Sequence, residues 1–271
     1  MDTLIPILPG LLTNLGVALG AVLGLWLLSI PLRDVSIIDM VFGVIMSAIV
    51  VLSWQRGGGS YPAANTMLAL VLLWALRMTA HLVRRNWGHG EDARYTKLRS
   101  WIDGAWAFHW LSLRKVFLLQ GVVLWLATLP AQLFLLSSEA PSLPLLPWVG
   151  AAIALVGLLW ETVADLQLAA FRRTAALRGT VLQTGLWRYC RHPNYFGELC
   201  FWWGIFLIAC AKPIAVVAII GPLAYSHLIV NVTGQATLDK KLAREKPGYA
   251  EYMARTNGMI PWPPKLPSDS T

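Results

Sequence analysis

Long apolar stretches recur along the chain and are separated by shorter polar segments. A helix needs about 20 residues to cross the roughly 30 Å hydrocarbon core of a bilayer, and these stretches are about that long. They lie at approximately 5–29, 36–54, 63–83, 115–137, 145–166, 195–211 and 213–232. The pattern therefore predicts an all-α, polytopic membrane protein with seven transmembrane helices.

The composition supports a membrane protein and argues against an additional soluble domain. The 271 residues are 56% hydrophobic and 13% charged, against about 25% charged in soluble domains, and include 14 tryptophans, which collect at membrane interfaces. The first apolar segment lacks a basic start and is too long for a cleavable signal, so we interpret it as a retained helix. We expect residues 1–271 to form a single integral-membrane domain.

Three glycines in the first apolar segment, Gly16, Gly20 and Gly24, are four residues apart. This spacing places them on one helix face and permits close approach of another helix. Two interpretations remain open from the sequence: tight packing inside the bundle, or a dimer interface.

The net charge of +8 is concentrated in segments that alternate with nearly uncharged loops. Basic residues cluster at 84–115, 172–191 and 240–255, whereas the intervening loops contain almost none. By the positive-inside rule the basic segments are cytoplasmic, so we expect the N-terminus outside and the C-terminus in the cytosol. This distribution indicates membrane topology and no nucleic-acid partner.

Common cofactor and metal motifs are missing from the sequence. It contains neither a G-x-G-x-x-G nor a G-x-x-x-x-G-K-[ST] motif, so neither a Rossmann fold nor a P-loop is expected. Cys190, Cys200 and Cys210 form no C-x-x-C pair, and we expect no metal site.

Ionisable residues nevertheless occur inside the apolar segments, where each costs about 2.5–3.5 kcal/mol on insertion scales and so marks a candidate functional site. The polar set within the spans is Asp39, Arg77, His81, Glu161, Asp165, Arg172, His227 and Asn231. With the expected topology they all fall in the cytosolic half of the bundle and predict a polar pocket open to the cytosol. Alternatively, the basic members extend to the interface, and Asp39 is only a counter-ion of Arg77.

The segment "GLWRYCRHPNYFGELCFWWG" (185–204) places basic residues directly before a predicted helix. Pro193 suits the first helical turn, and the free N–H groups of such a turn bind anions. Arg191 and the adjacent His192 add phosphate donors, while Asn194 and Glu198 lie on one face. The alternative, a basic interfacial anchor, does not explain Glu198.

The stretches "TGLWRYCRHPNYFGE" and "KPGYAEYMARTNGMIPW", together with "RNWGHGEDARYTKLR" at 85–99, carry a family resemblance. From around Val35 to Trp262 the chain resembles the steroid 5-alpha-reductase family, in particular its bacterial members, and more distantly the sterol delta-14 and delta-7 reductases. The resemblance implies an oxidoreductase of the bacterial inner membrane, which binds NADPH in a cytosol-facing cavity and reduces a carbon–carbon double bond conjugated to a ketone. Its substrate would be a lipid-like enone, a steroid or another isoprenoid.

The resemblance also implies roles for individual residues. The helices within about 5–137 would bind the substrate, and the helices and tail within about 145–262 would bind the cofactor. Asp39 matches the catalytic carboxylate, with Arg77 and His81 assisting it, and Trp74 stands at the substrate site where the steroid enzymes have a tyrosine. The implied cofactor contacts are Glu161, Asp165, Leu168, Arg172, Tyr189, Arg191, His192, Asn194, Tyr195, Glu198, Tyr249, Tyr252 and Arg255.

A different enzyme class remains open. Isoprenylcysteine carboxyl methyltransferases and phospholipid methyltransferases look similar over the R-H-P-x-Y-x-G and E-Y-x-x-R segments, and they bind S-adenosylmethionine. The excess of cations favours a phosphate-rich cofactor and therefore the reductase. A membrane scaffold or transporter is the third interpretation, but the sequence shows neither an inverted repeat nor helices broken at mid-membrane.

Overall fold

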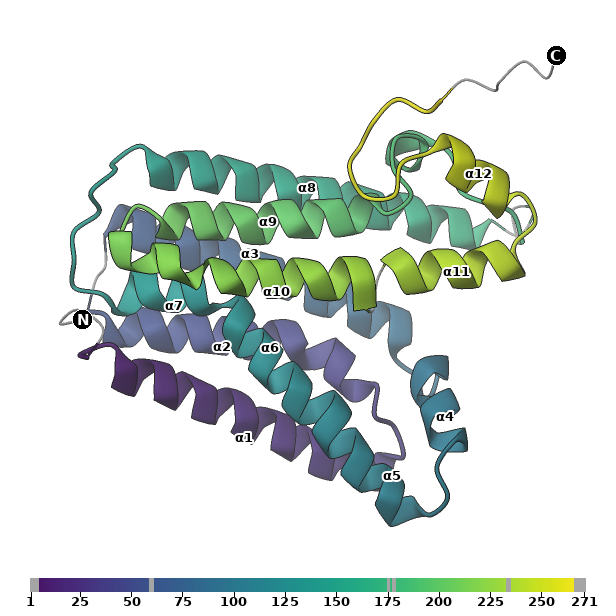
Figure 1. Cartoon of the computed structure of the whole chain (residues 1–271), viewed down its shortest axis with the longest axis horizontal. Helices are drawn as coiled ribbons and strands as arrows, with labels where there is room; N and C mark the ends of the chain where they lie inside the picture. The colour runs from purple at the N-terminus through teal and green to yellow at the C-terminus, as the bar shows by residue number, and fades with distance from the viewer. Residues whose placement is uncertain (1–4, 59–60, 175, 177–178, 233–234, 266–271) are drawn as a thin grey trace. The chain divides into compact units, whose positions relative to one another are not determined.

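The computed structural model describes residues 5–58, 61–174, 176, 179–232 and 235–265, and every regular element in these ranges is helical (Figure 1). The all-α prediction is therefore confirmed. In chain order the elements are α1 (Leu8–Leu32), α2 (Ile37–Arg56), α3 (Pro62–Asn86), α4 (Ala93–Ser100), α5 (Ala105–Ser112), η1 (Leu113–Leu118), α6 (Leu119–Ala127), α7 (Leu129–Leu136), α8 (Leu146–Arg173), η3 (Gly185–Arg188), α9 (Pro193–Ala209), η4 (Pro213–Ile219), α10 (Ile220–His227), η5 (Leu228–Val232), α11 (Gln235–Glu245) and α12 (Tyr249–Arg255).

Among the described residues, six helical stretches are long and apolar enough to cross a membrane, which indicates an integral membrane protein in contact with lipid. They are Leu8–Leu32, Ile37–Arg56, Pro62–Asn86, Ala105–Ala127, Leu146–Arg173 and Pro213–Glu245. The remaining predicted span corresponds to α9, whose 17 residues extend about 26 Å, slightly less than the hydrocarbon core. The count of seven spans and their orientation therefore stay predictions.

The fourth predicted span, 115–137, is wrong in its boundaries. The helix begins at Ala105, runs through η1 and ends at Ala127, and the separate helix α7 follows. Arg114 and Lys115 interrupt the apolar run but are good helix formers, so the helix continues through them. Pro130, in the first turn of α7, lacks an N–H and cannot extend the preceding helix.

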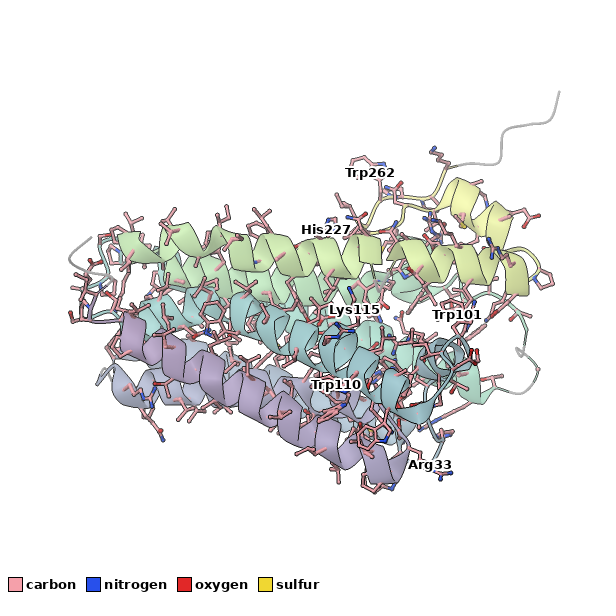
Figure 2. All side chains as sticks on the ribbon, turned by 60° about the horizontal axis from the view of Figure 1, so that its bottom comes forward. Arg33, Trp101, Trp110, Lys115, His227 and Trp262 are labelled. Carbon is pink, nitrogen blue, oxygen red and sulfur yellow. The ribbon has the colours of Figure 1, made fainter. Side chains whose placement is uncertain are left out.

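The chain divides into two compact units, which we describe separately. Unit 1 comprises Met1–Trp148 and Ile205–Gly221, and unit 2 comprises Val149–Gly204 and Pro222–Thr271. In unit 1, α2 is central and packs against α1, α3, α6 and α7. The side chains of Trp101 and Trp110, at the end of α4 and on α5, lie on its surface (Figure 2).

Buried polar groups in unit 1 connect its helices. The Asn14 amide donates to the Ser53 hydroxyl at 2.8 Å and to Oε1 of Gln132 at 3.0 Å, which links α1, α2 and α7. Lys212 is 1% exposed, and its ammonium group donates to the carbonyls of Phe134 and Ser137 at the end of α7. These bonds satisfy polar groups that would otherwise be costly to bury.

In unit 2, α8 and α9 lie side by side and approach each other closely at glycines (Figure 1). A Cβ atom added at Gly197 would lie 2.5 Å from the backbone nitrogen of Glu161, and one at Gly157 would lie 2.5 Å from that of Phe201. Gly204 meets Ala154 in the same way. Small residues therefore bring the two backbones together, as they commonly do in membrane helices.

The three glycines of α1 differ from those of α8 and α9. Gly16, Gly20 and Gly24 are exposed, and no described atom outside α1 lies within 4 Å of the Cβ position at any of them. Packing inside unit 1 therefore does not explain their spacing, and the dimer interface stays a prediction.

We predict that Gly197→Ala lowers the free energy of unfolding by about 1–3 kcal/mol, because the added methyl group meets backbone atoms of α8. Gly20→Ala is the matched control and should leave stability unchanged or raise it, since its Cβ position is open and Ala favours a helix. Thermal unfolding in detergent, followed by circular dichroism, compares both variants with the parent. Equal midpoints for all three proteins would contradict the close α8–α9 packing.

Candidate functional site

In unit 1, the segment at 91–99 binds the chain just before α2. The Val35 N–H donates to Oε1 of Glu91 at 3.0 Å, and the Asp92 N–H donates to the Ser36 hydroxyl at 3.3 Å. Arg99 holds Glu91 in place through two hydrogen bonds of 2.8 and 3.1 Å. This clamp fixes the first turn of α2, where Asp39 lies.

The Asp39 carboxylate accepts hydrogen bonds from two residues of the same segment. Nη2 of Arg94 lies 2.7 Å from Oδ2, and the Tyr95 hydroxyl donates to Oδ1 at 3.2 Å. Arg94 also pairs with Asp92, the N-cap of α4; burial opposes ionisation of Asp92, but Arg94 holds the pKa of this carboxyl below its usual value. Asp39 keeps an exposed side-chain fraction of 18%, so it is accessible while paired.

Asp39 has a partner that the sequence did not suggest. The structure pairs Asp39 with Arg94, and the alternative in which Arg77 is its counter-ion stays a prediction. Arg77 and His81 are half-buried on α3, and Trp74 is fully buried there, where it packs edge-to-face on Phe42 with ring centroids 5.9 Å apart. Sequence reasoning missed Arg94 and Tyr95. The stretch "EDARYTKLR" could have revealed them, because its Asp92 is a good N-cap and predicts a short helix that carries both residues.

In unit 2, α8 and α9 bury three carboxylates in apolar surroundings. Glu161, Asp165 and Glu198 are 2%, 6% and 7% exposed. The Asn194 amide donates to Asp165 at 3.3 Å, and the Tyr225 hydroxyl donates to Glu198. Together these five residues form what we call the acceptor cluster.

The acceptor cluster contains a buried amide oxygen without a hydrogen-bond partner in the part of the chain that the structure describes. Oδ1 of Asn194 is buried and has no hydrogen-bond partner among the described residues, although buried amide oxygens are normally bonded. Four of the cluster's residues were predicted from the sequence. Tyr225 was missed because it lies in an apolar run, where a hydroxyl was the only signal.

Arg191 and His192, which lie directly before α9, bind another buried carboxylate, that of Asp239 on α11. Nη2 of Arg191 lies 2.8 Å from Oδ2 of Asp239, and Nε2 of His192 lies 2.9 Å from Oδ1. The Tyr249 hydroxyl donates to Oδ1 at 2.6 Å. Burial and the nearby Asp239 raise the pKa of Tyr249 above its ordinary value, so this hydroxyl remains a neutral donor.

Arg191 and His192 also hold the C-terminal tail. Nη1 of Arg191 donates to the carbonyls of Met253 and Thr256. The backbone N–H groups of Arg191 and His192 donate to the carbonyls of Asn257 and Gly258 at 2.9 and 3.1 Å. The guanidinium group of Arg191 therefore donates to protein partners. The sequence had suggested that it would bind phosphate instead.

The other predicted cofactor contacts in unit 2 are placed individually. The Tyr195 ring stacks on His192, the Tyr252 hydroxyl donates to the Trp187 carbonyl, and Arg255 donates to Gln183. Leu168 is half-buried on α8, and Tyr189 and Arg172 are exposed. Among the described residues, no group of three or more His, Cys, Asp or Glu side chains is placed to hold a metal ion.

We predict that Asp239→Asn destabilises unit 2 by about 3–5 kcal/mol, because it leaves the buried Arg191 guanidinium without a counter-charge. Glu251→Gln is the control, since Glu251 is exposed on α12 and bears the same charge. Limited proteolysis and thermal unfolding measure the effect, with cleavage expected to begin within 235–265. A variant as stable and as resistant as the control would show that Asp239 does not hold the tail.

Comparisons with known proteins cover nearly the same residues as the resemblance described above, but they assign no activity. An uncharacterized protein of Schizosaccharomyces pombe is 22% identical over 274 residues, which cover 91% of this chain and 78% of the relative. No solved structure matched the chain. Residues 25–256, which contain the Asp39 clamp and the acceptor cluster, match the family described as "Protein of unknown function (DUF1295)". The chain therefore belongs to the DUF1295 family.

Proposed function

We propose that the protein is an NADPH-dependent membrane reductase of carbon–carbon double bonds conjugated to a ketone, acting on a lipid-like enone such as a steroid or another isoprenoid. The acceptor cluster of unit 2 carries this proposal. Burying several carboxylates in apolar helices is costly, and such groups are characteristic of functional sites. The resemblance described above supplies the reaction type.

The acceptor cluster fits the nicotinamide end of the cofactor. Nicotinamide and its ribose present donors, namely an amide N–H₂ and hydroxyl groups. The carboxylates and the unsatisfied Oδ1 of Asn194 can accept hydrogen bonds from them. When bound, NADPH supplies the hydride. Because Arg191 donates to Asp239 and the tail, the phosphates must be bound by other basic residues.

The Asp39 group of unit 1 fits the substrate carbonyl. As hydride adds to the β-carbon of an enone, negative charge grows on the carbonyl oxygen, and a preorganised donor stabilises it. Tyr95 and Arg94 supply such donors beside Asp39. In this proposal Tyr95 provides the hydroxyl that Trp74 cannot, and this hydroxyl donates to the carbonyl oxygen. Asp39, in its protonated form, gives its proton to the α-carbon and is then reprotonated from solvent, to which it is partly exposed.

The alternative is an S-adenosylmethionine-dependent membrane methyltransferase of the isoprenylcysteine carboxyl methyltransferase type. One observation favours it: the buried carboxylates of the acceptor cluster would attract a cationic sulfonium. The exposed basic residues of unit 2, which suit phosphates, favour NADPH.

Binding of the two cofactors to the purified protein separates these functions. We expect calorimetry in detergent to detect NADPH binding and no binding of S-adenosylmethionine at equal concentration, because only NADPH carries phosphates. Asn194→Leu should weaken NADPH binding by about tenfold, since the amide contact contributes roughly 1.5 kcal/mol. Saturable binding of S-adenosylmethionine without NADPH binding would contradict the reductase function and favour the methyltransferase function.

We further predict that Asp39→Asn and Tyr95→Phe each lower turnover by about 10²–10⁴-fold while NADPH affinity stays near the parental value, as for a lost general acid. Asp92→Asn is the matched control, because Asp92 binds the same Arg94 but does not take part in the proposed chemistry. Single-turnover hydride transfer, NADPH affinity and melting temperature are measured together. Parental hydride transfer in a stable Asp39→Asn variant would remove Asp39 from the reaction; a loss of stability alone would show a structural ion pair.

A further inference from the structure

A cavity of about 470 Å³ in unit 2 is lined by residues of α11 and α12. Its volume falls within the roughly 300–1,000 Å³ typical of small-molecule sites. The lining residues are Ala236, Asp239, Lys240, Ala243, Arg244 and Met253.

The lining combines an apolar surface with two available cations. Ala236, Ala243 and Met253 provide the apolar part. Lys240 and Arg244 are four residues apart and so share one face of α11. Both are exposed, and neither forms a hydrogen bond or an ion pair with any residue that the structure describes.

The one acidic residue of the lining does not cancel these cations. Asp239 already pairs with Arg191 and His192 and accepts from Tyr249, so Arg191 balances its negative charge and Lys240 and Arg244 do not. The cavity therefore has a net positive charge and suits an anionic ligand with an apolar portion.

We propose that this cavity binds the adenosine 2′-phosphate end of NADPH, with Lys240 and Arg244 as the phosphate contacts. The inference rests on the proposed function and extends it to a site for the second end of the cofactor. The adenine ring packs against Met253 and the two alanines, and the basic pair binds the phosphate that distinguishes NADPH from NADH. Lys240 and Arg244 thereby take the role that the sequence had suggested for Arg191.

The test compares NADPH and NADH binding, by calorimetry in detergent, to the parent and to Lys240→Gln/Arg244→Gln. The parent should prefer NADPH, because NADH lacks the 2′-phosphate. The double variant should bind NADPH about 10- to 100-fold more weakly and bind NADH with near-parental affinity, so that the preference disappears. Lys241→Gln, which removes an adjacent exposed charge that does not line the cavity, should behave as the parent.

The outcomes distinguish the inference from the function on which it rests. If the parent binds neither nucleotide, the proposed reductase function fails, and the phosphate site fails with it. If the parent binds NADPH and the double variant binds it equally well, the reductase function stands and the phosphate site is overturned. Equal weakening by Lys241→Gln would likewise overturn it, because the effect would then reflect general charge.

Discussion

A charge inside an apolar chain must be paired, and this requirement organises both units of the protein. Asp239 shows it most fully, because one buried carboxylate accepts from Arg191, His192 and Tyr249 and so fixes the start of α9 against α11 and α12. Removing one partner of such a group costs several kcal/mol. Arg191 and His192, the basic residues before α9, therefore stabilise the fold of unit 2, whatever part they take in the chemistry.

This assignment divides the polar residues of unit 2 into two sets with different tasks. Arg191, His192 and Asp239 hold the tail. The buried Glu161 and Asp165 and the half-buried Asn194 are acceptors brought together by the close approach of α8 and α9 at Gly197. The first set is satisfied within the protein. The second retains an unsatisfied amide oxygen and so has capacity for a ligand.

The sequence predicted the helices and much of the acceptor cluster, because apolar runs of membrane length and polar residues within them are local signals. Pro193 marked the start of α9 correctly for the same reason. The partners were not predictable: Arg94 lies 55 residues from Asp39 in sequence and Asp239 lies 48 residues from Arg191, and no local pattern selects one arginine or carboxylate among several. The presence of glycines on a helix face also did not distinguish the open face of α1 from the packed face of α9.

The central claim is that the chain transfers hydride from NADPH to a conjugated enone. The most direct measurement incubates purified protein with NADPH deuterated at the transferred C4 position and a panel of 4-ene-3-ketosteroids and other isoprenoid enones, and analyses the products by mass spectrometry. The account predicts at least one saturated ketone with a single deuterium at the β-carbon and a solvent-derived proton at the α-carbon. Absence of NADPH oxidation across the panel, with methyl transfer from S-adenosylmethionine to a lipid acceptor, would contradict it.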